Sequence, residues 1–122
     1  MFPLVADVAE LDAARRLLMM ELERAKGEGR TPPHEVKVGV MLEVPSLLWQ
    51  LDALLGSVDF VSLGTNDLLQ YFYAADRNNA RLGNRYDVLS PAFLNALHAV
   101  IDRCRASRTT LCVCGEMASH PL

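Results

Sequence analysis

Acidic, amide and thiol side chains follow three apolar runs in this 122-residue sequence. Glu43 lies in VKVGVMLEV, Asn66 and Asp67 follow FVSLG, and Cys114 ends TTLCVC. If the runs are neighbouring strands of a parallel sheet, about 4.8 Å apart, their polar ends lie at one edge. Two carboxylates there would repel each other without a cation between them. Such hard oxygen ligands suit Mg²⁺ or Mn²⁺, with positions left for water and a phosphorylated substrate.

Arg77 and Cys114 add two further kinds of chemistry to this predicted edge. Arg77 follows the Asn66-Asp67 turn and can reach back over it to bind phosphate with both arms of its guanidinium. Cys114 offers a proton or a thiolate. Each residue also has a simpler interpretation: Glu43 as a strand-end acid bonded to an amide, Asn66-Asp67 as a helix cap, Arg77 as a solvated side chain, and Cys114 as an inert buried thiol.

Alternating apolar runs and amphipathic segments predict the elements that position these residues. Asp7 and Glu10 resemble a capping box, Thr65 and Asn66 can cap a second helix, and Ser90 before a proline is a strong N-cap signal. The predicted strands are 1–5 (a strand end), 36–44, 58–64 and 109–114, and the predicted helices are 8–26, 46–55, 67–75 and 91–105.

This order of elements is typical of an α/β protein with a parallel sheet and helices packed on it. Four strands are half of an eight-stranded barrel, and the chain starts within one strand and stops soon after another. We therefore expect about half of a TIM (β/α)₈ barrel, a piece of a larger domain. The polar stretch 80–89 is predicted to be a functional loop.

Composition limits the classes of function. With 51% hydrophobic and 22% charged residues, the chain can form one core and no more. A net charge of −3 without a block of Lys or Arg argues against nucleic acid as the main partner. No apolar stretch approaches the roughly 20 residues that span a bilayer. Acidic residues near the N-terminus and an odd number of cysteines favour a cytoplasmic protein.

Four motifs carry a resemblance over nearly the whole chain: GVMLEVPS, DFVSLGTNDLLQY, AADRNN and LCVCGEMA. They resemble the phosphoenolpyruvate (PEP)-binding domain of enzyme I of the bacterial phosphotransferase system. The phrases NDLLQY and YDVLSP are closer to its nitrogen-related paralogue. The resemblance implies about half of a (β/α)₈ barrel domain that uses PEP and Mg²⁺ to phosphorylate a histidine on a separate swivelling domain. The complete protein is expected to be a homodimer that passes the phosphoryl group to a histidine-containing phosphocarrier protein.

The resemblance also implies a role for each candidate residue. Glu43 and Asp67 match the Mg²⁺ ligands, Asn66 and Arg77 match contacts to the substrate phosphate, and Cys114 matches the acid that protonates the enolate carbon. The histidine motif of the swivelling domain is absent from this sequence, and other phosphate-binding arginines of the family lie upstream of it. We therefore predict that the chain alone lacks turnover.

Three other interpretations stay open. The first is pyruvate phosphate dikinase or PEP synthase, which shares the strand-end Glu, the Asn-Asp pair and the Cys-Gly-Glu. The second is a non-catalytic assembly module, because half a barrel exposes two strand edges. The third is a Mg²⁺-dependent aldolase or lyase, which would not need Cys114. The sequence also leaves open whether the pathway moves sugars or regulates nitrogen, and His120 takes the place of a residue usual in the family.

Overall fold

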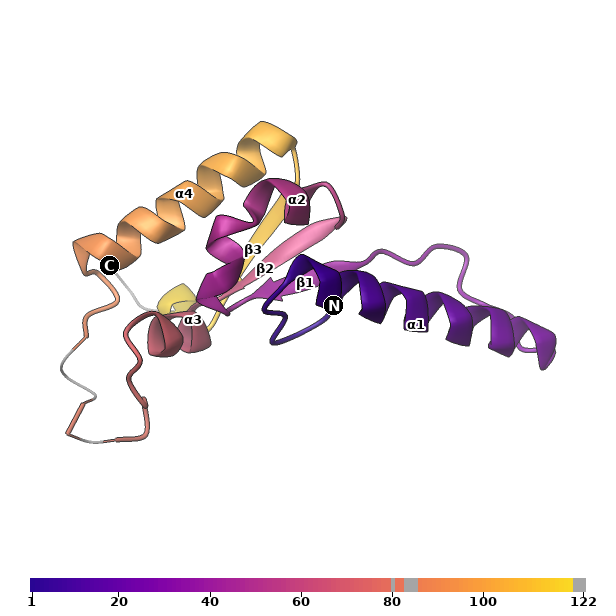
Figure 1. Ribbon diagram of the computed structural model, residues 1–122, viewed down its shortest axis with the longest axis horizontal. Helices are drawn as coiled ribbons and strands as arrows, with labels where there is room; N and C mark the ends of the chain where they lie inside the picture. The colour runs from indigo at the N-terminus through magenta and orange to yellow at the C-terminus, as the bar shows by residue number, and fades with distance from the viewer. Residues whose placement is uncertain (80, 83–85, 120–122) are drawn as a thin grey trace.

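The computed structural model describes residues 1–79, 81–82 and 86–119. Within these residues the chain forms an α/β fold around a three-stranded parallel sheet in the order β1-β2-β3 (Figure 1). The elements are α1 (Val8–Gly27), β1 (Gly39–Leu42), the 3₁₀ helix η1 (Pro45–Trp49), α2 (Leu51–Leu55), β2 (Phe60–Gly64), α3 (Thr65–Phe72), α4 (Pro91–Ser107), β3 (Thr110–Cys114) and the 3₁₀ helix η2 (Glu116–Ser119). The predicted fold class, a parallel sheet with helices, is confirmed.

One face of the sheet carries the core. Side chains at alternate positions of β1 and β2, such as Val40, Leu42, Val61 and Leu63, are almost completely buried. Because side chains alternate across a strand, these four point to one face, where α2 and α4 supply further apolar side chains. The buried core residues from these helices are Leu51, Leu54, Leu55, Phe93, Leu97, Val100 and Cys104. Burial raises the pKa of the Cys104 thiol.

The sheet is shorter than the sequence predicts at its first edge. Residues 1–5 contribute only an isolated parallel bridge, between Phe2 and Val40, instead of a strand end. The predicted strand 36–44 narrows to Gly39–Leu42. Its early part leaves the ladder because the Asp59 carboxylate, just before β2, accepts the Val38 N–H at 2.6 Å. The Asp59 N–H donates in turn to the Val38 carbonyl at 2.8 Å, so these two bonds continue the contact outside the ladder.

The other edge strand is less buried than predicted. Three of the five residues of β3 are exposed and two are half-buried, so the strand is not the buried one predicted, and the Cys112 side chain is exposed instead of filling an interior. β3 lies at the end of the strand order, so one of its sides has no neighbouring strand among the described residues. The edge position accounts for the exposure.

Helix ends follow the sequence signals in some places and depart from them in others. Asp7 caps α1 by accepting from the Ala9 N–H, and the Glu10 carboxylate accepts from the Ala6 N–H, one residue before the N–H that a capping box would bond. The predicted helix 46–55 is divided into η1 and α2. Ser90 stands at the N-cap of α4, but its hydroxyl bonds to the Tyr73 hydroxyl at 2.6 Å and not to the helix backbone.

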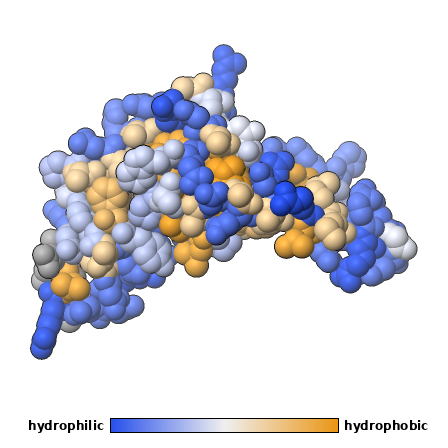
Figure 2. Space-filling view, in the orientation of Figure 1, coloured by the Kyte–Doolittle hydropathy of each residue, from blue (hydrophilic) through white to orange (hydrophobic). Residues whose placement is uncertain are grey.

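α1 extends from the sheet into solvent, and its only buried residue is Leu11 (Figure 1). Figure 2 shows hydrophobic side chains on its middle part, where Leu17, Met19 and Met20 are exposed. Among the described residues no helix has the length and apolar character needed to cross a membrane. His120 and part of the predicted loop 80–89 lie outside the described residues.

Candidate functional site

The carboxyl ends of the three strands lie together at one edge of the sheet. In the parallel register Leu42 pairs with Leu63, and Gly64 pairs with Cys114. Glu43 follows Leu42 and Gly64 follows Leu63, so Glu43 lies beside Gly64. The side chain of Glu43 crosses directly over this glycine, because a Cβ built on Gly64 would lie 2.8 Å from Glu43 Oε2. Glycine is therefore required there for Glu43 to pack against β2.

Glu43 is a buried carboxylate, with 3% of its surface exposed. Its Oε1 atom accepts a hydrogen bond of 2.7 Å from the backbone N–H of Leu4. Leu4 has a positive φ of 51°, a conformation uncommon for a leucine. The carboxylate thus holds the segment beside β1 in place, and its second oxygen lies on the side of Gly64.

α3 begins directly after β2 and connects the site to the end of β3. Thr65 donates to the Cys114 carbonyl at 2.8 Å, and Asn66 Oδ1 accepts from the backbone N–H of Glu116 at 3.0 Å. The sequence-based prediction that Thr65 and Asn66 cap the helix is wrong: Gly64 takes the cap position and no side chain caps the first turn. Both side chains instead bond to the turn after β3. The Asn66 Nδ2 group remains available as a donor toward a ligand.

Gly115 allows Thr65 and Asn66 to bond to the turn after β3. Its φ is +105°, and a Cβ there would lie 2.5 Å from Thr65 Oγ1 and 2.8 Å from Asn66 Oδ1. We expect Gly115→Ala to destabilise the full-length protein by about 2 kcal/mol or more, because the change combines backbone strain with a steric clash. Chemical denaturation measures the loss. Gly27→Ala is the matched control, because nothing lies within 4 Å of a Cβ at Gly27; equal effects of the two changes would contradict this account of Gly115.

Asp67 and Arg77 form an ion pair next to this connection. Asp67 lies in the first turn of α3, and its Oδ1 is 3.1 Å from Arg77 Nη1. The backbone N–H of Arg77 donates to Gln70 Oε1 at 3.3 Å, which ties the returning chain to α3. Arg77 therefore does reach back over the turn, as its position in the sequence predicts. The Asp67 side chain is 31% exposed and that of Arg77 52%, so both remain accessible to a ligand.

Cys114 lies on the sheet face opposite the helices, within a small cluster of polar groups. Its Sγ is 3.3 Å from the Leu63 carbonyl, to which it donates, and 3.4 Å from the Ser62 hydroxyl, which donates to sulfur. Ser62 is 5% exposed. Sequence analysis did not single it out, although a serine two positions before Gly64 must share the face of the residue paired with Gly64. The strand alternation in FVSLG was the available signal.

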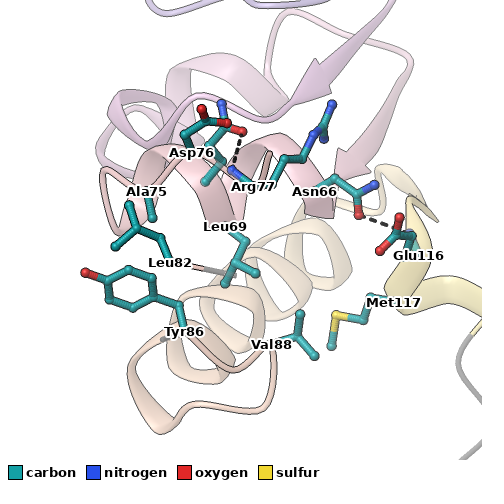
Figure 3. A pocket seen from close by; sticks show the side chains of 11 residues that line it. Asn66, Leu69, Ala75, Asp76, Arg77, Leu82, Tyr86, Val88, Glu116 and Met117 are labelled. Atoms are coloured by element: carbon teal, nitrogen blue, oxygen red, sulfur yellow. Dashed lines mark hydrogen bonds between the residues drawn. The ribbon is translucent and has the colours of Figure 1, made fainter. Parts of the chain in front are cut away.

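A pocket of about 300 Å³ adjoins two of the predicted residues (Figure 3). Asn66 and Arg77 line it, together with apolar side chains from α3, the following segment and η2. Figure 3 shows the Asn66 side chain directed toward Glu116, with a dashed line marking their hydrogen bond. Glu43, Asp67 and Cys114 do not line this pocket. The structure therefore places all five predicted residues near one edge, but only two of them share this cavity.

The donor set at the edge fits Mg²⁺ or Mn²⁺ better than a softer metal. Among the described residues no group of three or more His, Cys, Asp or Glu side chains is arranged to hold a metal ion. Mg²⁺, however, commonly takes only one or two protein carboxylates and keeps its other positions for water and substrate phosphate. Glu43 and Asp67 are the two carboxylates at this edge that such an ion could use.

Comparisons with known proteins identify the family of this chain. Residues 1–122 match the family model described as PEP-utilising enzyme, PEP-binding domain. The chain is 42% identical over 125 residues to the "Phosphoenolpyruvate-dependent phosphotransferase system" protein of Salmonella typhimurium and 43% identical to that of Escherichia coli K12; each match covers all of this chain and 16% of the relative. The "Phosphoenolpyruvate-protein phosphotransferase" of Bacillus subtilis is 39% identical over 122 residues, again with all of this chain and 21% of the relative.

The family match extends over every element described above, including the strand ends that carry Glu43, Asp67 and Cys114. The chain spans about a fifth or less of the length of these curated relatives. The family is thus established over the whole chain. This chain belongs to the PEP-utilising enzymes, in which it corresponds to the PEP-binding domain.

Proposed function

We propose that this chain supplies part of the catalytic edge of a PEP-protein phosphotransferase, on a partial (β/α)₈ barrel. The observation that carries the proposal is the parallel register that sets Glu43 beside Gly64 and Gly64 opposite Cys114. A carboxylate, an amide-acid pair and a thiol then meet at one edge of the sheet. The names of the relatives support the choice of PEP as substrate and of a phosphotransferase over a dikinase.

Each side chain has a role that its surroundings support. Asn66 uses its Oδ1 to hold Glu116 and keeps its Nδ2 donors for the substrate phosphate. Arg77, with a half-exposed guanidinium beside Asp67, binds the same phosphate and spreads the charge of the transferring phosphoryl group. Glu43 and Asp67 would hold Mg²⁺. When bound, the metal would offset the negative charge of the substrate and stabilise the developing enolate.

Cys114 completes the reaction by proton transfer. The phosphoryl group passes to a histidine on a separate domain, which leaves the enolate of pyruvate. The S–H bond of Cys114 then breaks and a C–H bond forms at the methylene carbon, so that pyruvate is released and a thiolate remains. Water later returns a proton to the sulfur. The acceptor histidine, its phosphocarrier partner and the homodimer belong to the complete protein, and the chain alone is expected to be inactive.

The test measures pyruvate release by the full-length protein and by residues 1–122 alone, with PEP, Mg²⁺ and the purified phosphocarrier protein. Coupling to lactate dehydrogenase gives the rate. We expect Mg²⁺-dependent pyruvate release from the full-length protein and none from the isolated chain. Absence of PEP-dependent pyruvate release and of PEP binding by the full-length protein would overturn the proposed function. Turnover by the isolated chain would overturn only the prediction that it is inactive.

A further inference from the structure

Ser62 is the one buried hydroxyl whose donor is directed at the Cys114 sulfur among the described residues. It lies in the middle of β2, with Val61 and Leu63 on either side pointing into the core. Burying a serine hydroxyl in such a strand costs free energy unless the hydroxyl is hydrogen-bonded. The Ser62 Oγ finds its partner across the strand pair, at the Cys114 Sγ 3.4 Å away.

We propose that Ser62 is a positioning residue for Cys114, an inference that rests on the proposed function. Its hydroxyl holds the sulfur at the level of Gly64, while the Cys114 thiol donates to the Leu63 carbonyl. When the thiol gives its proton to the enolate carbon, the charge remains on sulfur. The Ser62 O–H then donates to a thiolate, and a hydrogen bond to an ionised partner is stronger than one to a neutral partner.

Two thiols, Cys112 and Cys114, lie on the same face of β3, but the Ser62 hydroxyl bonds only to that of Cys114. Ser62 pairs with Cys112 in the register, yet the Cys112 Sγ bonds to the Val61 carbonyl at 3.6 Å. Thr65 adds a second restraint, because its hydroxyl holds the Cys114 carbonyl. Backbone and side chain of Cys114 are therefore each held by a buried hydroxyl from the neighbouring segment.

The first test measures alkylation of Cys114 by iodoacetamide at pH 7 in the full-length protein, with Cys112→Ser and with or without Ser62→Ala. Site-resolved mass spectrometry follows Cys114. We expect Ser62→Ala to slow alkylation about 5- to 10-fold, the loss of one hydrogen bond to an ionised sulfur. Cys112 in a Cys114→Ala background is the matched control. An unchanged Cys114 rate, or equal changes at Cys112 and Cys114, would overturn the positioning role.

The second test compares Ser62→Ala, Cys114→Ala and the double variant in a double-mutant cycle. The readouts are pyruvate release and exchange of the pyruvate methyl protons with deuterated water. We expect Ser62→Ala to lower both rates about 5- to 10-fold with little change in the KM for PEP, and to add nothing once Cys114 is replaced. Additive effects would overturn the inference. If the unsubstituted protein neither binds PEP nor releases pyruvate, the proposed function fails, while the alkylation test still decides whether Ser62 acts on Cys114.

Discussion

Replacing Cys114 by alanine is expected to slow pyruvate release from PEP by about 10²- to 10⁴-fold, the usual contribution of a positioned general acid. The thiol lies at the carboxyl edge and is half-buried, with its sulfur held between the Ser62 hydroxyl and the Leu63 carbonyl. Alanine removes the only proton donor that this strand places there. Affinity for PEP should stay within about threefold, because neither of the proposed phosphate contacts changes. Steady-state kinetics and PEP titration of the full-length protein measure the two quantities.

The control for this change is Cys112→Ala. Cys112 lies two residues earlier on the same face of β3, is exposed, and bonds to a backbone carbonyl. Its replacement should leave the rate within about twofold. A Cys114→Ala protein with full activity would contradict the assignment of the acid and favour a Mg²⁺-dependent aldolase or lyase, whose chemistry does not need this thiol.

The fold class and the placement of Glu43, Asn66 and Cys114 at the strand ends could be predicted because both depend on local patterns. Apolar runs followed by polar residues identify parallel strands and their carboxyl ends without knowledge of tertiary contacts. The Asp7 cap is equally local, since acceptor and donor are two residues apart. Lengths were harder to predict: the Asp59 carboxylate takes a strand N–H that the apolar pattern at 36–38 assigns to the ladder.

The roles of Thr65 and Asn66 depend on contacts with residues far away in the sequence. Their partners are Cys114 and Glu116, some 50 residues later in the sequence. The local pattern after Gly64 favoured a helix cap, which was a reasonable but wrong interpretation, because the register of β2 against β3 decides what these side chains meet. The same register sets Ser62 against the Cys114 sulfur. Sequence patterns identify strands, but cross-strand partners follow only from the register.

Glu43→Gln and Asp67→Asn are each expected to weaken Mg²⁺ binding about 10- to 100-fold in the full-length protein, because each removes one of the two proposed anionic ligands while keeping shape and hydrogen-bonding capacity. Glutamine can still accept from the Leu4 N–H, which limits the structural damage at this buried site. Isothermal titration with Mg²⁺, or Mn²⁺ binding followed by electron paramagnetic resonance, measures affinity without catalysis. Unchanged affinity in both variants would remove the metal assignment.

Two further variants are controls for the Mg²⁺ affinities. One removes a carboxylate elsewhere on the protein, and the other removes the proposed phosphate contact. Asp52→Asn removes an exposed carboxylate on α2 that pairs with Arg103, far from the strand ends, and should leave Mg²⁺ affinity unchanged. Arg77→Ala removes the guanidinium 3.1 Å from Asp67. Because the guanidinium and a cation would compete for the same carboxylate, this change should preserve or strengthen Mg²⁺ binding while weakening PEP binding about 10-fold or more. Equal losses of both affinities would instead mean that Arg77 acts by holding the structure around Asp67.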